Sequence, residues 1–210
     1  MRAVIYILIA LAAYLISAVN PAIVLSRLIY HTDIRTQGSG NPGFTNFRRV
    51  FGARYAWFVF ALDLLKAALV TCAGGVLFHL RGDPWQTGVA YAGVFALLGH
   101  AFPVFYGFHG GKGFLVCLST LWVLDWRAGG IATLLMVILL LTTKYMSLST
   151  MVSLIVGSMC LALFDATLPA CLMYAACVLF VILRHSANIH RLFRGTETKF
   201  TFGHRRDKTE

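Results

Sequence analysis

The stretch AVIYILIALAAYLISAVNPAIVLS, residues 3–26, contains 24 consecutive residues without a charge. A helix needs about 20 predominantly apolar residues to cross the hydrocarbon core of a bilayer. The stretch is longer than the apolar core of a signal peptide, which spans about 7–15 residues, and it continues through Pro21 to Arg27. We therefore interpret it as a retained first membrane span.

The composition of the whole chain supports a membrane protein. Of 210 residues, 59% are hydrophobic and 12% are charged, whereas soluble domains have about 45–50% apolar and about 25% charged residues. A soluble globular enzyme, a disordered chain and a disulfide scaffold are excluded. The net charge of +10 does not indicate nucleic-acid binding, because no basic run outside the apolar segments is interleaved with aromatic residues. All five cysteines lie inside apolar stretches without a CxxC pair, so we expect neither a disulfide nor a metal site; they are Cys72, Cys117, Cys160, Cys171 and Cys177.

The remaining apolar segments predict an all-α integral membrane protein with about seven transmembrane helices. Segments 114–124 and 128–143 are short, so they form either two short spans or one hairpin that does not cross, which reduces the total to five. Both counts are odd, which predicts that the termini lie on opposite sides. The expected segments are 3–29, 55–80, 85–106, 114–124, 128–143, 146–164 and 167–183.

Positive charge indicates the orientation. Fourteen Lys and Arg residues fall in one set of connections and three in the other, so the first set is expected to be cytoplasmic and the N-terminus outside. We expect residues 1–200 to form one membrane domain, followed by a basic polar tail, 201–210. Asp63 and Lys66 lie inside the second span on one helix face, where a structural ion pair is the simpler interpretation and a functional site the alternative. The larger set is Arg27, Arg35, Arg48, Arg49, Arg54, Lys112, Lys144, Arg184, Arg191, Arg194, Lys199, Arg205, Arg206 and Lys208; the smaller is Arg2, Arg81 and Arg127.

The first cytoplasmic loop, DIRTQGSGNPGFTNFRRVFGAR (residues 33–54), combines glycines, neutral polar groups and arginines. Glycine permits positive φ and close backbone approach, and successive N–H groups in such a loop can form an anion-binding nest. The alternative is a plain turn whose arginines serve topology alone. The residues concerned are Gly38, Gly40 and Gly43, then Ser39, Asn41, Thr45 and Asn46, and finally Arg48 and Arg49.

A second loop, GHAFPVFYGFHGGKGF (residues 99–114), surrounds Lys112 with Gly110, Gly111 and Gly113. We expect the glycines to let a phosphate reach both backbone N–H groups and the ammonium, although the lysine alone could serve topology. A Walker A loop is excluded, because Tyr106 occupies the first glycine position and Gly113 follows the lysine.

Two further stretches are candidates. Ser147, taken alone, is typical of a helix N-cap. In RHSANIHR (residues 184–191), His185 and Asn188 share a face if the last helix continues, while a basic membrane-exit helix is the simpler interpretation. No HxxxxD, GxSxG or HExxH motif is present, and carboxylates are scarce. This inventory favours phosphate binding and transfer from an already activated donor.

The stretches GSGNPGFTNFRR (38–49), GHAFPVFYGFHGGKG (99–113) and HSANIHRLFRGTE (185–197) resemble the bacterial acyl-phosphate-dependent glycerol-3-phosphate acyltransferases of the PlsY family. The resemblance implies a seven-span inner-membrane enzyme with its active site at the cytoplasmic face. It would transfer an acyl group from acyl phosphate to the sn-1 hydroxyl of glycerol 3-phosphate, giving lysophosphatidic acid and phosphate. Departures from the family pattern fall at His109, Phe44 and residues 18–21.

The resemblance also implies the site. It implies catalytic roles for Ser39, Arg49, Lys112, His185 and Asn188 and substrate binding by Ser147 and Glu197. From the composition of the two loops we further expect substrate binding by Gly38, Gly40, Asn41, Thr45, Asn46, Gly110, Gly111 and Gly113. We expect a substrate phosphate to accept the hydroxyl proton, with His185 as the only competing base, and we expect no metal or cofactor. The expected partners are glycerol 3-phosphate, acyl phosphate and membrane lipids, with no nucleic acid, and we expect the protein to work as a monomer. Rival hypotheses are a transporter or channel for phosphorylated solutes and a structural membrane subunit.

Overall fold

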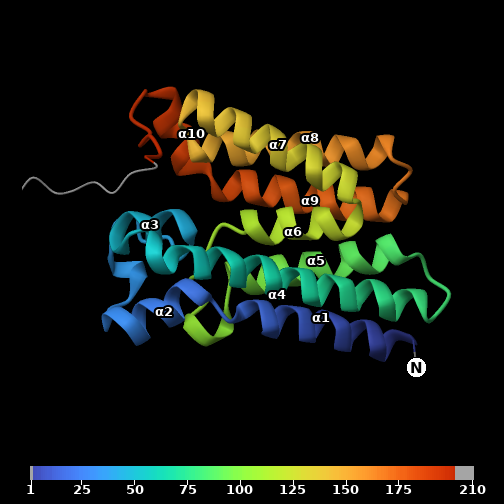
Figure 1. The fold of residues 1–210 in the computed structure, drawn as a ribbon. Coiled ribbons are helices and arrows are strands. Elements are labelled where there is room, and N and C mark those ends of the chain that lie inside the picture. The colour runs from blue at the N-terminus through green and yellow to red at the C-terminus, as the bar shows by residue number, and fades with distance from the viewer. Residues whose placement is uncertain (1, 202–210) are drawn as a thin grey trace, which may run out of the picture.

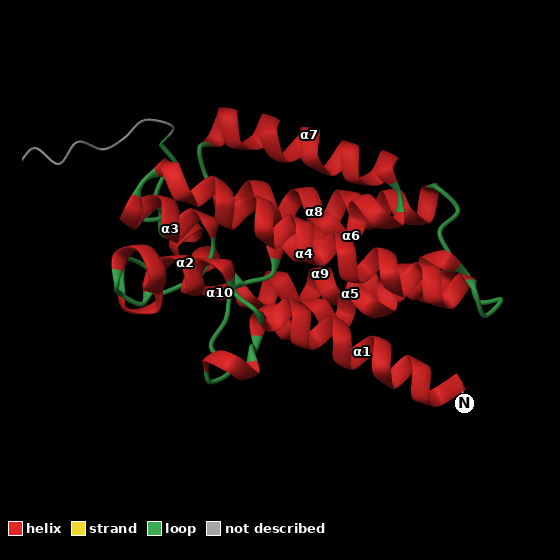
Figure 2. Cartoon of the chain, turned by 60° about the horizontal axis from the view of Figure 1, so that its bottom comes forward, coloured by secondary structure: helices red, strands yellow, loops and turns green. Residues whose placement is uncertain are grey.

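The computed structural model describes residues 2–201, which form helices and loops without a strand (Figures 1 and 2). The prediction of an all-α fold is thus confirmed, while the predicted tail lies outside the described residues except for Thr201. The long helices form one bundle, and the short helices α2, α3 and α10 lie together at the end far from the N-terminus (Figure 1). The helices are α1 (Arg2–Ala18), α2 (Pro21–Tyr30), α3 (Phe44–Phe51), α4 (Ala53–His79), α5 (Trp85–Ala101), α6 (Phe114–Leu124), α7 (Trp126–Thr143), α8 (Met146–Leu163), α9 (Leu168–Arg184) and α10 (Ser186–Phe193), with 3₁₀ turns at Ile34–Thr36 and Val104–Tyr106.

Within this part of the chain, five segments are long and apolar enough to cross a bilayer, and the bent pair α9–α10 adds a sixth if it is counted as one span. The segment expected at 128–143 begins earlier, at Trp126, and its 18 residues reach spanning length. Large apolar side chains are exposed along these helices, as expected for faces in contact with lipid; they include Leu8, Leu69, Leu134 and Leu172. The five single segments are Ala3–Tyr30, Ala53–His79, Trp85–Tyr106, Trp126–Thr143 and Met146–Leu163.

The first segment is not one uninterrupted helix. It breaks between α1 and α2, where Pro21 starts the second helix and the side chain of Asn20 accepts a hydrogen bond from Ile23 N. Proline lacks an N–H group and its ring collides with the preceding turn, so it is tolerated at a helix start but interrupts a helix interior. The expected first span, 3–29, therefore corresponds to Ala3–Tyr30, which is built from two helices.

Helix α6 is short because the loop before it folds back into the bundle. Gly110 N and Gly111 N donate to the carbonyls of Ala101 and His100 at the end of α5. Gly113, directly before α6, lies against Leu97, about one turn inside the end of α5. Eleven residues of helix therefore start within the bundle rather than at its surface.

Despite its length, α6 lies at the centre of the fold. It packs against α4, α5, α7, α8 and α9, and most of its side chains are buried. The helix carries the second glycine-rich loop on its N-terminal end and so fixes that loop against five neighbouring helices.

Candidate active site

The motifs from distant parts of the sequence meet around one cavity of about 1160 Å³. It lies at the end of the bundle that holds α3 and α10 (Figure 1). Of the fifteen site residues expected from the sequence, three do not line it, namely Gly40, Gly110 and Gly111. The twelve that do are Gly38, Ser39, Asn41, Thr45, Asn46, Arg49, Lys112, Gly113, Ser147, His185, Asn188 and Glu197.

Among the helices that begin at this cavity are α3, α6 and α8. Their N-cap residues, Gly43, Gly113 and Tyr145, form no side-chain hydrogen bond to the helix they precede. By contrast, Asn20 and Asp125 cap α2 and α7 with their side chains and do not line the cavity. A helix N-terminus without a side-chain cap offers free N–H groups and partial positive charge to an anion. Three of them around one cavity favour a phosphate-binding site.

In the first loop, Asn46 fixes the backbone around Gly38 and Ser39. Its Oδ1 accepts from Ser39 N at 2.9 Å, and its Nδ2 donates to Gln37 O at 3.0 Å. Gly38 has a φ of 58° and leaves no room for a Cβ beside Asn46. The amide of Asn46 is therefore engaged by the loop itself, so this residue shapes the site, while the exposed Ser39 side chain lines the cavity.

Arg49 follows on α3 and is the free cation of this loop. It is exposed, lines the cavity, and forms no hydrogen bond or ion pair with other residues in the part of the chain described. Arg48, its neighbour, is instead engaged: it donates to Thr201 O at 2.6 Å and lies over the ring of Phe200. The adjacent arginines thus divide between anion binding and fastening the C-terminal segment.

In the second loop, the glycines act through their lack of a Cβ. The N–H groups of Gly110 and Gly111 are bound by α5 carbonyls, so, contrary to expectation, they are not offered to a ligand. Their carbonyls accept from Arg184 at 3.2 Å each. Gly113, with a φ of 90°, adopts the left-handed region directly before α6. The result is a rigid turn that presents the next side chain, Lys112, to the cavity.

Lys112 combines partial burial with a nearby hydrogen-bond acceptor. Its Nζ donates to Asn188 Oδ1. Burial lowers the pKa of Lys112 to about 8, with Glu197 opposing this and the neighbouring arginines adding to it. The ammonium is therefore a poorly solvated cation, and a bound anion would stabilise its charged form.

The last motif lies at a bend rather than in a continuous helix. Helix α9 ends at Arg184, the chain turns by 58°, and α10 starts at Ser186. The bend brings both His185 and Asn188 to the cavity. His185 Nδ1 donates to Val181 O at 2.8 Å, which leaves Nε2 as the nitrogen with a free lone pair.

Glu197 organises the residues around it. Its carboxylate accepts from Ser147 Oγ at 2.7 Å, Asn188 Nδ2 at 2.6 Å and Arg191 Nε at 2.7 Å. Burial alone would raise the pKa of Glu197, but these hydrogen bonds outweigh it and lower the pKa. Ser147 is the second residue of α8 and Tyr145 is the N-cap, so the interpretation of Ser147 as an N-cap was wrong.

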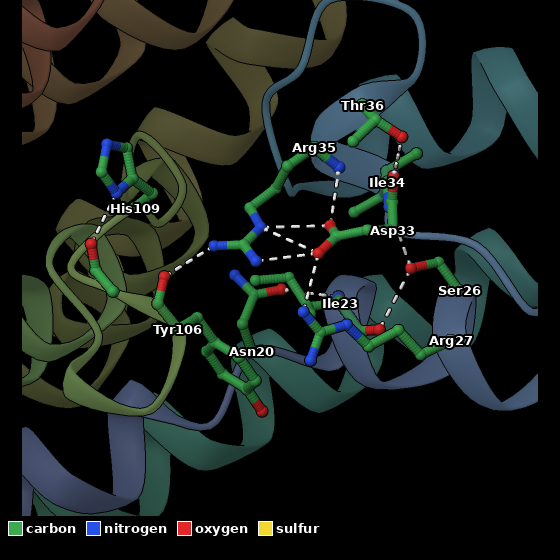
Figure 3. Close-up of polar contacts among 11 residues, drawn as sticks. Asn20, Ile23, Ser26, Arg27, Asp33, Ile34, Arg35, Thr36, Tyr106 and His109 are labelled. Carbon is green, nitrogen blue, oxygen red and sulfur yellow. Dashed lines mark hydrogen bonds and ion pairs between the residues drawn. The ribbon is translucent and has the colours of Figure 1, made fainter.

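A polar cluster ties the two glycine-rich loops together (Figure 3). Arg35 forms hydrogen bonds with Asp33 and donates from its third nitrogen to Tyr106 O at 2.6 Å. The hydrogen bonds from Arg35 hold the pKa of Asp33 well below its usual range. Arg27 binds the same carboxylate at 2.8 Å. Because residues 31–37 and 103–107 are joined here, the loops cannot shift independently.

The structure also brings to the cavity two residues outside the expected set of fifteen. Asp63 and His100 line it from within α4 and α5. The apolar periodicity of these helices gave no indication of this position, since it depends on how the second loop folds back. One wall is apolar, which suits a hydrocarbon chain beside the polar groups; it consists of Phe44, Phe60, Phe114, Leu115 and Met136.

Comparisons with known proteins agree with this geometry. The family described as glycerol-3-phosphate acyltransferase matches residues 7–195. A glycerol-3-phosphate acyltransferase of Lactiplantibacillus plantarum is 32% identical over 197 residues, covering 94% of this chain and 93% of that protein. The crystal structure of PlsY, an integral membrane glycerol 3-phosphate acyltransferase, in its glycerol 3-phosphate form has a TM-score of 0.85 at 28% identity, covering 93% of this chain and 96% of PlsY. Its lysophosphatidic acid form has a TM-score of 0.82 at 27% identity, covering 93% and 95%.

Proposed function

Because the chain belongs to the glycerol-3-phosphate acyltransferase family, we propose that it transfers an acyl group from acyl phosphate to the sn-1 hydroxyl of glycerol 3-phosphate. Membership and the match to PlsY make the chain a multi-pass membrane acyltransferase, as the sequence predicted. The proposal adds the donor, the position acylated and the mechanism. The products are lysophosphatidic acid and phosphate.

The observation that carries the proposal is the cavity itself. Five cationic side chains line it, Arg48, Arg49, Lys112, Arg191 and Lys199, together with the uncapped N-termini of α3, α6 and α8 and with apolar side chains. Two phosphate groups and one hydrocarbon chain are the chemistry that acyl phosphate and glycerol 3-phosphate bring together. The PlsY crystal forms with glycerol 3-phosphate and lysophosphatidic acid support an acceptor and a product of this class.

The proposed step needs no nucleophilic residue. The sn-1 oxygen of glycerol 3-phosphate forms a bond to the acyl carbon, the bond from that carbon to the phosphate oxygen breaks, and the electron pair leaves with the phosphate. The hydroxyl proton is transferred to a phosphate oxygen. Phosphate is a stabilised leaving group, so positioning and charge stabilisation supply most of the catalysis.

Each side chain has a part in this step. Ser39, Arg49 and Lys112 bind and neutralise phosphate oxygens, and Asn188 orients the acceptor while it holds Lys112. His185, through Nε2, is the side chain that competes with the substrate phosphate as base. The two carboxylates at the cavity are both engaged, Glu197 by three donors and Asp63 by Lys66.

The proposal places the protein in a bacterial inner membrane with the cavity at the cytoplasmic face and with residues 1–200 acting as one domain. The excess of positive charge on the connections at that end supports this orientation. We further propose that a monomer suffices, since every residue assigned to the site comes from one chain.

The test is an assay of purified protein with palmitoyl phosphate and radiolabelled glycerol 3-phosphate. Lysophosphatidic acid acylated at sn-1 is the expected product. Product formation only with palmitoyl-coenzyme A or with acylated carrier protein would overturn the donor assignment. Uptake of glycerol 3-phosphate into proteoliposomes without acylation would instead indicate a transporter.

A further inference from the structure

Three ionisable side chains lie inside the membrane-spanning helices beside the cavity. Asp63 and Lys66 come from α4 and His100 from α5, and Asp63 and His100 are 1% and 4% exposed. Lys66 Nζ forms an ion pair with Asp63 Oδ1 at 2.8 Å and lies 3.3 Å from His100 Nδ1. His100 Nδ1 is 3.5 Å from the same carboxylate oxygen. His100 belongs to the second loop stretch, 99–114, whereas Asp63 and Lys66 lie outside the motif stretches.

The first connection runs from Lys66 to the break between α1 and α2. Lys66 Nζ donates to Val19 O at 2.8 Å. The next residue, Asn20, donates to Pro42 O at 3.1 Å and so holds the first glycine-rich loop. By binding Val19 O, Lys66 fixes the backbone next to Asn20, the residue whose side chain holds the first glycine-rich loop.

The second connection runs from His100 to the other loop. The carbonyl of His100 accepts from Gly111 N at 3.1 Å, and its ring lies so close to Gly111 that a Cβ there would overlap Nε2. The residue after Gly111 is Lys112. The place of the His100 ring therefore sets how deeply the lysine-bearing loop enters the bundle.

Stability alone does not account for this cluster. A buried ion pair is often no more stable than apolar residues of similar volume, because desolvation offsets the attraction. Charged side chains at membrane depth are costly and usually mark function. Here Lys66 Nζ contacts Asp63 of α4, His100 of α5 and the Val19 carbonyl at the α1–α2 break. The cluster therefore links the backbone segments that hold the first and the second glycine-rich loop.

We propose that Asp63, Lys66 and His100 are positioning residues that set the distance between the two phosphate-binding loops, and hence between the Arg49 and Lys112 cations. This inference rests on the proposed function. The cluster acts through Asn20 on one side and Gly111 on the other, and the reacting atoms lie in the cavity between the loops.

The test compares two variants that avoid leaving a buried charge unpaired. His100→Phe keeps a ring of similar size but removes both nitrogens. The double variant Asp63→Asn/Lys66→Met removes both charges at once. In each, the KM for glycerol 3-phosphate is expected to rise at least about fivefold and kcat/KM to fall at least about tenfold, because a small misplacement of binding groups is costly.

A merely structural role predicts a different result. Partial misfolding lowers the amount of active enzyme and therefore the apparent kcat. It leaves the KM for glycerol 3-phosphate and the KM for the acyl donor unchanged. Folded variants with a wild-type KM for glycerol 3-phosphate would overturn the inference. If one variant does not fold, His100→Gln replaces it under the same criterion. Thr71→Val is the matched control, because Thr71 is buried on α4 and bonds only to its own helix; its KM and kcat should equal those of the wild type.

Binding of glycerol 3-phosphate alone separates this inference from the proposed reaction. Calorimetric titration without any acyl donor should give a dissociation constant at least about fivefold weaker in both variants, by the same loss of preorganised binding geometry. Weaker binding in the variants supports the inference whether or not the wild-type protein uses palmitoyl phosphate. A wild-type protein that forms no lysophosphatidic acid from palmitoyl phosphate counts only against the proposed donor. Equal affinity in variants and wild type overturns it.

Discussion

At the scale of single residues, the cations of the site differ in whether protein groups already bind them. Arg48, Arg184 and Arg191 are each held by protein acceptors, whereas Arg49 has no partner within residues 2–201 and Lys112 has only the neutral amide of Asn188. A cation already paired with a carboxylate has little attraction left for a phosphate. Arg49 and Lys112 are held by no carboxylate and no backbone carbonyl within residues 2–201, so we expect them to bind substrate.

Replacing Lys112 by alanine should lower kcat/KM for acyl transfer at least about 100-fold, the usual cost of losing one donor to developing negative charge. The lysophosphatidic acid assay measures this directly. Arg54→Ala is the matched control, because Arg54 is exposed and does not line the cavity; its effect should stay within about twofold. Near-normal turnover by well-folded Lys112→Ala protein would remove the lysine from the mechanism.

The pH dependence of kcat/KM should report the same residue. Burial lowers the pKa of Lys112 to about 8, so the cation is complete below that pH and is lost as the pH rises through it. The rate is therefore expected to level off below pH 8 and fall above it, with the fall in kcat itself shifted to higher pH because bound phosphate stabilises the ammonium. Rates measured from pH 7 to pH 10 test this.

Lys112→Arg serves as the control for that profile. Its guanidinium stays charged throughout the range, so the alkaline fall should disappear even if the overall rate is lower. An unchanged alkaline fall in this variant would assign the titration to a different group.

At the scale of helices and loops, the site is built from where helices start. Gly113 is the residue on which this depends most, because its φ of 90° and the adjacent Leu97 side chain both exclude a Cβ. Only with glycine there can the loop turn into α6 one turn below the end of α5. The start of α6 and the placement of Lys112 are consequently one structural feature.

Gly113→Ala should therefore lower both the midpoint of thermal unfolding and acyl transfer. A strained positive φ costs about 1–3 kcal/mol for a residue with a side chain, and the displaced lysine should reduce the rate at least about tenfold. Gly130→Ala is the matched control on α7, where the nearest atom to an added Cβ is Trp122 Cη2 at 3.9 Å. It should be neutral or stabilise by about 0.5–1 kcal/mol. Equal behaviour of the two variants would show that the loop tolerates a shifted start of α6.

The sequence predicted most helices well, and the misses have physical causes. Segment 114–124 coincides with α6 because an apolar run ends at Asp125, whose side chain caps the next helix. The break at Asn20 was missed although Pro21 signals it, since apolar character continues through it. The bend at His185 carries no such signal, because no proline or glycine occurs there.

The site itself was predicted as far as motif chemistry reaches. Residue types showed which side chains could bind phosphate, but not which N–H groups were already used. Gly110 and Gly111 resemble anion-binding glycines, yet α5 occupies their N–H groups. That Asp63 and His100 reach the cavity depends on the tertiary contact between α5 and the returning loop, which no local pattern records.

At the scale of the whole molecule, α6 and α7 decide how the site can be reached. Lys112 precedes α6 and Ser147 follows α7, and both line the cavity. The chain must therefore travel away from the cavity and return to it between these residues. The connection at Asp125, between the two helices, then lies toward the far end of the bundle.

This path makes a labelling prediction for a protein from which the native cysteines have been removed. Gln37→Cys, on the exposed first loop, and Trp126→Cys, 71% exposed at the start of α7, should lie on opposite sides of the membrane. In intact cells, a membrane-impermeant maleimide is expected to label Trp126→Cys and spare Gln37→Cys, because the cavity end carries the positive charge that faces the cytoplasm. Inverted vesicles should give the opposite result. Labelling of both positions from one side would show that α6 and α7 do not cross, whereas opposite labelling with the sides exchanged would retain the crossing and reverse the orientation.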